Sequence, residues 1–74
     1  MSKKELIDLF FANISSDDWE KYDFIDPPYC WSITAEINVD GYVFVADGVF
    51  TTPDDYETQE LEVTTPEGET ITLI

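Results

Sequence analysis

The clearest pattern of apolar and polar positions is a strict alternation over residues 30–39. Its apolar positions are Ile33, Ala35, Ile37 and Val39, and its polar positions are Ser32, Thr34, Glu36 and Asn38. A period of two predicts a strand with one buried face. Asp40-Gly41 follows directly, and this dipeptide is typical of a two-residue hairpin turn. Such a turn would pair Val39 with Tyr42, Ile37 with Phe44 and Ala35 with Ala46, so every apolar side chain would share one face.

Two further strands are expected after this hairpin. Residues 56–64 place Leu61 and Val63 on the inner face, and residues 69–74 do the same with Ile71 and Leu73. The segment between them, Thr65-Pro66-Glu67-Gly68, has proline and glycine where a tight turn favours them. Asp47-Gly48, near the end of the second strand, suggests a β-bulge.

The N-terminal residues 3–14 predict an amphipathic helix. Ser2 and Glu5 have the spacing of a capping box, in which each residue's side chain accepts a hydrogen bond from the other's backbone. The apolar face is made of Leu6, Ile7, Phe10, Phe11 and Ile14. A helix of this length is marginal in isolation, so we expect it to pack on the sheet.

Residues 15–26 are ambiguous. Ser16 could cap a short helix over 17–22, which would turn Trp19, Tyr22 and Phe24 inward; otherwise the segment is irregular. Pro27-Pro28 ends any helix there. The sequence therefore predicts a single α+β domain over residues 1–74, in which the N-terminal helix packs on a four-strand antiparallel β-meander.

The most unusual feature of the composition is a large excess of negative charge. The chain of 74 residues has 17 acidic and three basic side chains, which gives a formal net charge of −14. The lysines are Lys3, Lys4 and Lys21, and no basic residue follows them. The carboxylates therefore lack internal counterions and repel one another. Direct binding to nucleic acid or to an anionic membrane is excluded, because both need positive charge.

The amino-acid composition gives little support for a catalytic function. The chain contains no histidine, no arginine, one cysteine (Cys30) and only three glycines. Nucleophile–base pairs, zinc sites and phosphate-binding loops need residues that this sequence does not offer. We expect a protein that is not an enzyme and has no cofactor or metal site. The single cysteine and the absence of a signal-peptide or membrane-span pattern favour a cytoplasmic protein.

One spacing resembles a calcium-binding loop. Oxygen-bearing side chains at Glu36, Asn38, Asp40 and Asp47, with Gly41, match the EF-hand positions 1, 3, 5, 12 and 6. The glutamate and aspartate at the two ends are exchanged, however, and the flanks are strand-like where an EF-hand has helices. The favoured interpretation is a hairpin with an Asp-Gly turn. Weak, nonspecific calcium or small-ligand binding by the acidic surface is a separate alternative.

The acidic strands are the candidate binding site. Same-face residues on a strand are about 6.6 Å apart, so two acidic strands side by side would carry about one charge per 3.3 Å. Duplex DNA carries one per roughly 1.7 Å. The predicted partner-binding residues are Asp54, Asp55, Glu57, Glu60 and Glu62, which follow one another along a loop and a strand, and Glu36 and Asp47, if the sheet order places their face alongside.

In size and charge the chain resembles small acidic phage proteins that block restriction or CRISPR complexes, and DNA mimics more broadly. This resemblance of kind implies an inhibitor that binds stoichiometrically to a basic, Lys/Arg-rich protein and occupies its nucleic-acid-binding surface. The alternative is an accessory interaction module or homodimer that docks through a sheet edge or through Val43 and Val45, with the acidity serving solubility.

Overall fold

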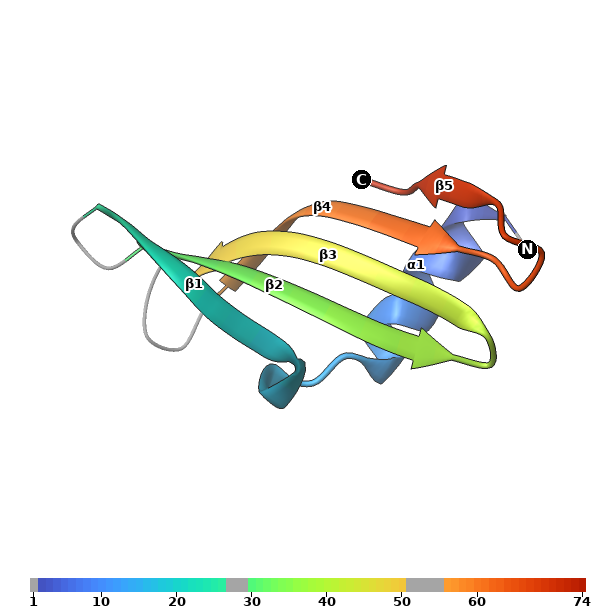
Figure 1. Ribbon diagram of the computed structural model, residues 1–74, viewed down its shortest axis with the longest axis horizontal. Helices are drawn as coiled ribbons and strands as arrows, with labels where there is room; N and C mark the ends of the chain where they lie inside the picture. The colour runs from blue at the N-terminus through green and yellow to red at the C-terminus, as the bar shows by residue number, and fades with distance from the viewer. Residues whose placement is uncertain (1, 27–29, 51–55) are drawn as a thin grey trace.

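The computed structural model describes residues 2–26, 30–50 and 56–74, and for residues 21–26 and 30 the description covers the backbone. Helix α1 (Lys3–Asn13) and a 3-10 turn, η1 (Ser16–Asp18), precede the strands β1 (Trp19–Asp26), β2 (Cys30–Val39), β3 (Tyr42–Phe50), β4 (Tyr56–Thr64) and β5 (Thr70–Thr72). The strands form one antiparallel sheet in the order β1-β2-β3-β4-β5. Helix α1 covers one face of this sheet (Figure 1).

The α+β class is confirmed, but the sheet has five strands where four were expected. The additional strand is β1, which lies in the ambiguous segment 15–26. Neither alternative for this segment, a short helix over 17–22 or an irregular stretch, describes it: a single 3-10 turn with Ser15 at its N-cap precedes the strand. The Asp18 carboxylate accepts hydrogen bonds from the Ser15 backbone N–H (2.9 Å) and hydroxyl (3.1 Å). Trp19 then begins the strand opposite Ala35.

An irregularity in β1 explains why the sequence pattern did not reveal this strand. Lys21 pairs with Ile33 and Asp23 pairs with Ser32, so Tyr22 is an extra residue in the ladder. A bulge of this kind shifts the alternation of faces by one residue. The two-residue period is therefore broken in the middle of β1.

Helix α1 begins with the predicted capping box. The Glu5 backbone N–H donates to the Ser2 hydroxyl, and the Ser2 backbone N–H donates to the Glu5 carboxylate, each at 3.2 Å. The hydrogen bond that the Ser2 backbone N–H donates to the Glu5 carboxylate lowers the pKa of Glu5, and the Ser2 hydroxyl adds a smaller effect in the same direction. Leu6 and Phe10 are buried against the sheet. Phe11, which the sequence also placed on the apolar face, is 47% exposed.

The β2–β3 hairpin has the predicted register. Val39 pairs with Tyr42, Ile37 with Phe44 and Ala35 with Ala46. Asp40 and Gly41 have φ of 52° and 87°, which is the left-handed conformation that a type I′ turn requires at both central positions. The Asn38 side-chain oxygen accepts a hydrogen bond from the Gly41 backbone N–H (3.2 Å). The hairpin interpretation of the calcium-loop spacing is thus confirmed.

Strands β3 and β4 are irregular at the place where a bulge was expected. Asp47 pairs with Glu60 but Gly48 pairs with Thr58, so the extra residue is Gln59 of β4. Glycine at 48 allows the two backbones to approach closely, because a Cβ atom there would overlap the carbonyl oxygen of Glu57. The bulge bends β4 and keeps Glu57 and Glu60 on the same face of the sheet.

The core lies between α1 and the sheet. Its buried residues are Leu6, Phe10, Trp19, Ile33, Ala35, Phe44, Ala46, Leu61 and Val63. Strand β5 adds Ile71 and Leu73, which are half-buried against this core as predicted. The strand is shorter than expected, but backbone pairing continues past it, since Leu73 N–H donates to the Leu61 carbonyl oxygen (2.7 Å).

Candidate protein-binding face

The sheet face that points away from α1, here called the outer face, is organised in rows by the strand register. One row runs Glu20, Thr34, Asp47, Glu60 from β1 to β4. The next row runs Glu36, Val45, Glu62, Thr72 from β2 to β5. A third row, on the other side of the first, places Glu57 of β4 opposite Val49 of β3. The meander thus brings six carboxylates from four strands onto one face.

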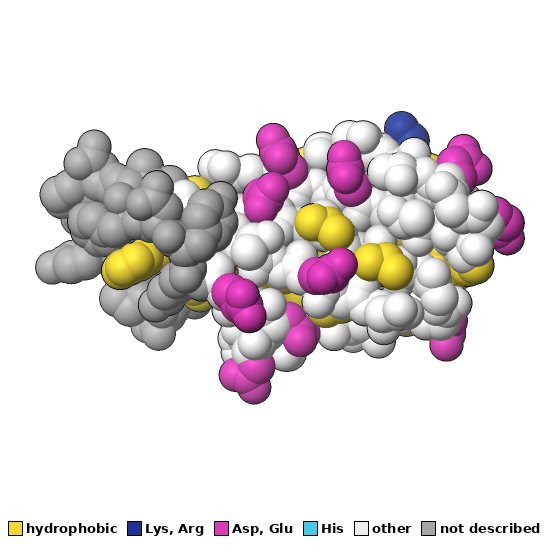
Figure 2. Space-filling view, viewed as in Figure 1, with side chains coloured by type: hydrophobic (Ala, Val, Ile, Leu, Met, Phe, Trp, Pro, Cys, Tyr) yellow, Lys and Arg dark blue, Asp and Glu magenta, His cyan; other side chains and the backbone are white. Residues whose placement is uncertain are grey.

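These carboxylates meet solvent. Glu20, Glu36, Glu57, Glu60 and Glu62 are exposed, and Asp47 is half-buried. Figure 2 shows acidic side chains spread over this face, with a basic side chain only at the margin. Six charges in three rows, with rows about 6.6 Å apart, give about one charge per 3.3 Å along the strand direction when the four strands are taken together. That density is close to that of one strand of a DNA duplex, about one phosphate per 3.4 Å.

Apolar side chains occupy the middle of this face. Val43, Val45 and Val49 belong to β3, the central strand, and Val45 is 42% exposed. Glu36 and Glu62 are the direct neighbours of Val45 on the two adjacent strands. The outer face of β3 is therefore a strip of valines interrupted by Asp47, with further carboxylates on the strands at both sides, and small yellow patches between the acidic side chains are visible in Figure 2.

The structure brings together five of the seven residues predicted for partner binding. Glu36, Asp47, Glu57, Glu60 and Glu62 share the outer face, while Asp54 and Asp55 lie outside the described residues. Asp47 of β3 lies directly beside Glu60 of β4, whereas Glu36 of β2 is separated from the acidic residues of β4 by β3. Whether these residues bind a partner stays a prediction.

Sequence reasoning missed two acidic residues at the start of β1. Glu20 joins the outer face opposite Thr34, and Asp18 ends the preceding turn. Together with Glu36 they line a recess of about 390 Å³ over Thr34 and Val45. The adjacent acidic residues Asp17, Asp18 and Glu20 were visible in the sequence, but only a strand at 19–26 could place one of them beside β2.

A like-charge pair on the outer face provides a stability test. Asp47 and Glu60 are direct cross-strand partners, so their Cα atoms are about 4.5–5.5 Å apart and their charges oppose folding. We expect Glu60→Lys to raise the free energy of unfolding by about 0.5–1 kcal/mol in low salt. Urea unfolding followed by circular dichroism measures this change.

Glu67→Lys is the matched control, because it makes the same charge change in the exposed β4–β5 turn. The advantage of Glu60→Lys over this control should shrink in 1 M salt, where the Debye length is about 3 Å. Equal stability of the two variants in dilute buffer would show that the Asp47–Glu60 repulsion is negligible.

No protein-family model matches the chain, and no curated protein or solved structure matches it significantly. Within the described ranges, no three or more Cys, Asp or Glu side chains converge closely enough to hold a metal ion. No helix in the same ranges is long and apolar enough to cross a membrane.

Proposed function

We propose that the protein is a stoichiometric inhibitor that binds a basic, Lys/Arg-rich protein and occupies the surface with which that partner holds nucleic acid. The observation that carries this proposal is the outer face. It has six carboxylates in three rows, and Lys3 and Lys4 belong to α1, which covers the other side of the sheet. A surface that binds phosphates through Lys and Arg would meet a similar spacing of negative charge here.

The central valines fit the same kind of partner. Lysine and arginine have alkyl stems that pack on apolar surface while their charged ends remain at its border. Such a stem can lie over Val45, and its charged end can then reach Glu36 on one side or Glu62 on the other. This arrangement supplies both buried apolar area and charge-assisted hydrogen bonds, which are stronger than neutral ones.

Displacement of DNA tests the proposal directly. Purified Lys/Arg-rich DNA-binding proteins are each loaded with a fluorescein-labelled duplex, and the acidic protein is titrated in while anisotropy is recorded. We expect one or more of them to release the duplex at a 1:1 ratio in about 50 mM salt. Raising the salt to about 200 mM should weaken the competition, since the contacts are ionic.

Glu60→Lys/Glu62→Lys tests the face itself. This double variant should compete at least tenfold less well than the unaltered protein. Its matched control is Glu67→Lys/Glu69→Lys, which makes the same change in net charge at exposed positions outside the outer face and should lose no more than about threefold. Equal losses in both would mean that net charge, not this face, drives binding.

The accessory-module alternative makes a different prediction. A module that docks through Val43 and Val45 should bind through apolar contacts, which high salt does not weaken. If no DNA-binding protein releases its duplex at 50 mM salt, the inhibitor proposal is wrong. Binding or dimerisation that persists in 1 M salt would then favour the accessory module.

A further inference from the structure

Part of β2 has a free edge. Strand β1 pairs with β2 only from Cys30 to Ala35. It begins at Trp19, opposite Ala35, and the preceding turn η1 does not pair with β2. Residues 36–39 of β2 pair with β3 on one side. On their other side, no strand of the described residues pairs with them.

The hairpin geometry determines which backbone groups this edge presents. In a two-residue hairpin the residues that flank the turn, here Val39 and Tyr42, form a hydrogen-bonded pair, and such pairs alternate along the ladder. Ile37 therefore also bonds to β3. The backbone N–H and C=O groups of Glu36 and Asn38 point the other way, toward the free edge. Unpaired edge groups of this kind are a template for another strand.

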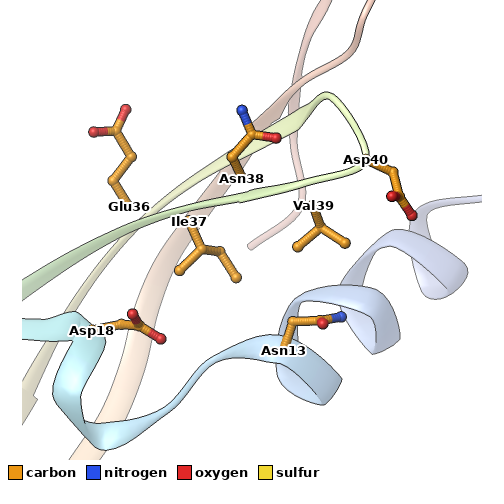
Figure 3. A pocket seen from close by; sticks show the side chains of 7 residues that line it. All are labelled: Asn13, Asp18, Glu36, Ile37, Asn38, Val39 and Asp40. Carbon is orange, nitrogen blue, oxygen red and sulfur yellow. The ribbon is translucent and has the colours of Figure 1, made fainter.

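The free edge borders a recess. A space of about 550 Å³ lies between β2 and the end of α1, lined by Asn13, Asp18, Glu36, Ile37, Asn38, Val39 and Asp40. Figure 3 shows Ile37 and Val39 pointing to the side where α1 and η1 lie, while Glu36 and Asn38 point to the opposite side. The edge thus has an apolar side and a polar side, and three of its lining residues are carboxylates.

We propose that an extended, Lys/Arg-containing segment of the basic partner adds to this edge as a sixth, antiparallel strand beside residues 36–39. The negative charge around the edge favours a basic segment over a second copy of the chain. Asp18, Glu36 and Asp40 surround the edge, whereas a second copy of the chain would bring its own net charge of −14. This inference rests on the proposed function, because it gives the same partner a second means of attachment, through main-chain hydrogen bonds.

The two sides of the edge predict the sequence of the bound segment. Residues of an added antiparallel strand that bond to Glu36 and Asn38 have their side chains on the outer face, where Glu20 and Glu36 favour Lys or Arg. The intervening residues face Ile37 and Val39, which are half-buried and favour apolar side chains. Strand addition of this kind takes affinity from main-chain bonds and specificity from alternate side chains.

Three peptides of equal charge test the inference. The probe is an acetylated, amidated octapeptide of alternating Lys and Val, and the other two carry N-methyl groups either on every Lys or on every Val. In the proposed arrangement the Lys N–H groups face β2. Methylation of Lys should therefore weaken binding at least tenfold relative to methylation of Val, as measured by calorimetry in about 50 mM salt. Binding should also slow amide exchange at Glu36 and Asn38.

Variants at Asn38 test the same contact from the protein's side. Asn38→Pro removes the backbone N–H at the free edge, where proline is tolerated in a strand. Asn38→Ala is its control, because both variants lose the side-chain hydrogen bond to Gly41. We expect Asn38→Pro to bind the octapeptide at least tenfold more weakly than Asn38→Ala. If Asn38→Pro does not fold, the methylated peptides decide the question.

Two outcomes separate this inference from the proposed function. If the two methylated peptides bind equally well, attachment is by charge alone and strand addition is wrong, while DNA displacement through the outer face can still succeed. If the methylated peptides differ as expected but no duplex is displaced, the edge binds extended basic segments and the inhibitor proposal fails. Dimerisation of the protein with residues 36–39 protected, and no peptide binding, would also overturn the inference.

Discussion

Replacing Phe10 by alanine is expected to lower the free energy of unfolding by about 3–5 kcal/mol, the usual cost of removing a buried phenylalanine side chain. Phe10 is fully buried. Its ring lies 5.6 Å from that of Phe44 and 6.5 Å from that of Trp19, measured between centroids. It therefore joins α1 to the middle of the sheet and to the start of β1. A domain of this size has about 5 kcal/mol of stability or less, so the variant should retain about 2 kcal/mol or less.

The adjacent Phe11 is the matched control. It is on the same helix but is 47% exposed, and its ring packs against that of Phe10 (5.1 Å). Phe11→Ala should change stability by no more than about 1 kcal/mol, because the lost contact is offset by the higher helix propensity of alanine. Urea titration of both variants measures the difference. Similar losses at the two positions would mean that α1 is rotated relative to the described arrangement.

The second large effect is expected at Gly48. A methyl group at this position would overlap the Glu57 carbonyl oxygen and would come within 3.2 Å of the Glu57 carbonyl carbon and 3.3 Å of the Thr58 Cα. These neighbours are backbone atoms of β4, so the strand itself must move. We expect Gly48→Ala to cost about 3 kcal/mol or more, at the upper end of overpacking. Amide spectra should show the changes concentrated in β3 and β4.

Gly68→Ala is the control for Gly48→Ala, because it separates steric overlap from backbone strain. Gly68 has a φ of 90°, which disfavours alanine, but a Cβ atom there would have no neighbour within 4 Å. Strain alone should cost about 1–2 kcal/mol, less than the loss at Gly48. If Gly68→Ala were the more harmful change, the close approach of β3 and β4 would not be a significant constraint.

The hairpin was predictable because two independent signals agree there. The alternation over residues 30–39 and the Asp-Gly turn require the same register, and the structure has it. Strand β1 was not predictable by this reasoning, because the extra residue Tyr22 interrupts its alternation. The helix was found through its cap and its period. The exact orientation of the helix could not be predicted. Phe10 and Phe11 are adjacent and equally hydrophobic, so only packing against the sheet determines which of them is buried.

The candidate site was only partly predictable, because it depends on strand order. The sequence indicated that Glu60 and Glu62 share a face, as residues two apart on any strand do. It could not show that β1 adds Glu20 to this face. The mixed character of the outer face, with valines and Asp47 on β3 between the carboxylates of the other strands, follows from that order.

The meander has a consequence for how the chain folds. Among the described residues, each strand pairs with the strands that precede or follow it directly along the chain. Local pairings of this kind give a low contact order, which speeds folding, because no long loop must close before contacts form. The sheet can grow one hairpin at a time from the Asp40-Gly41 turn. More distant contacts join Phe10 to Phe44 and Trp19 to Tyr56, so the packing of α1 and β1 against the formed hairpins is expected to limit the folding rate.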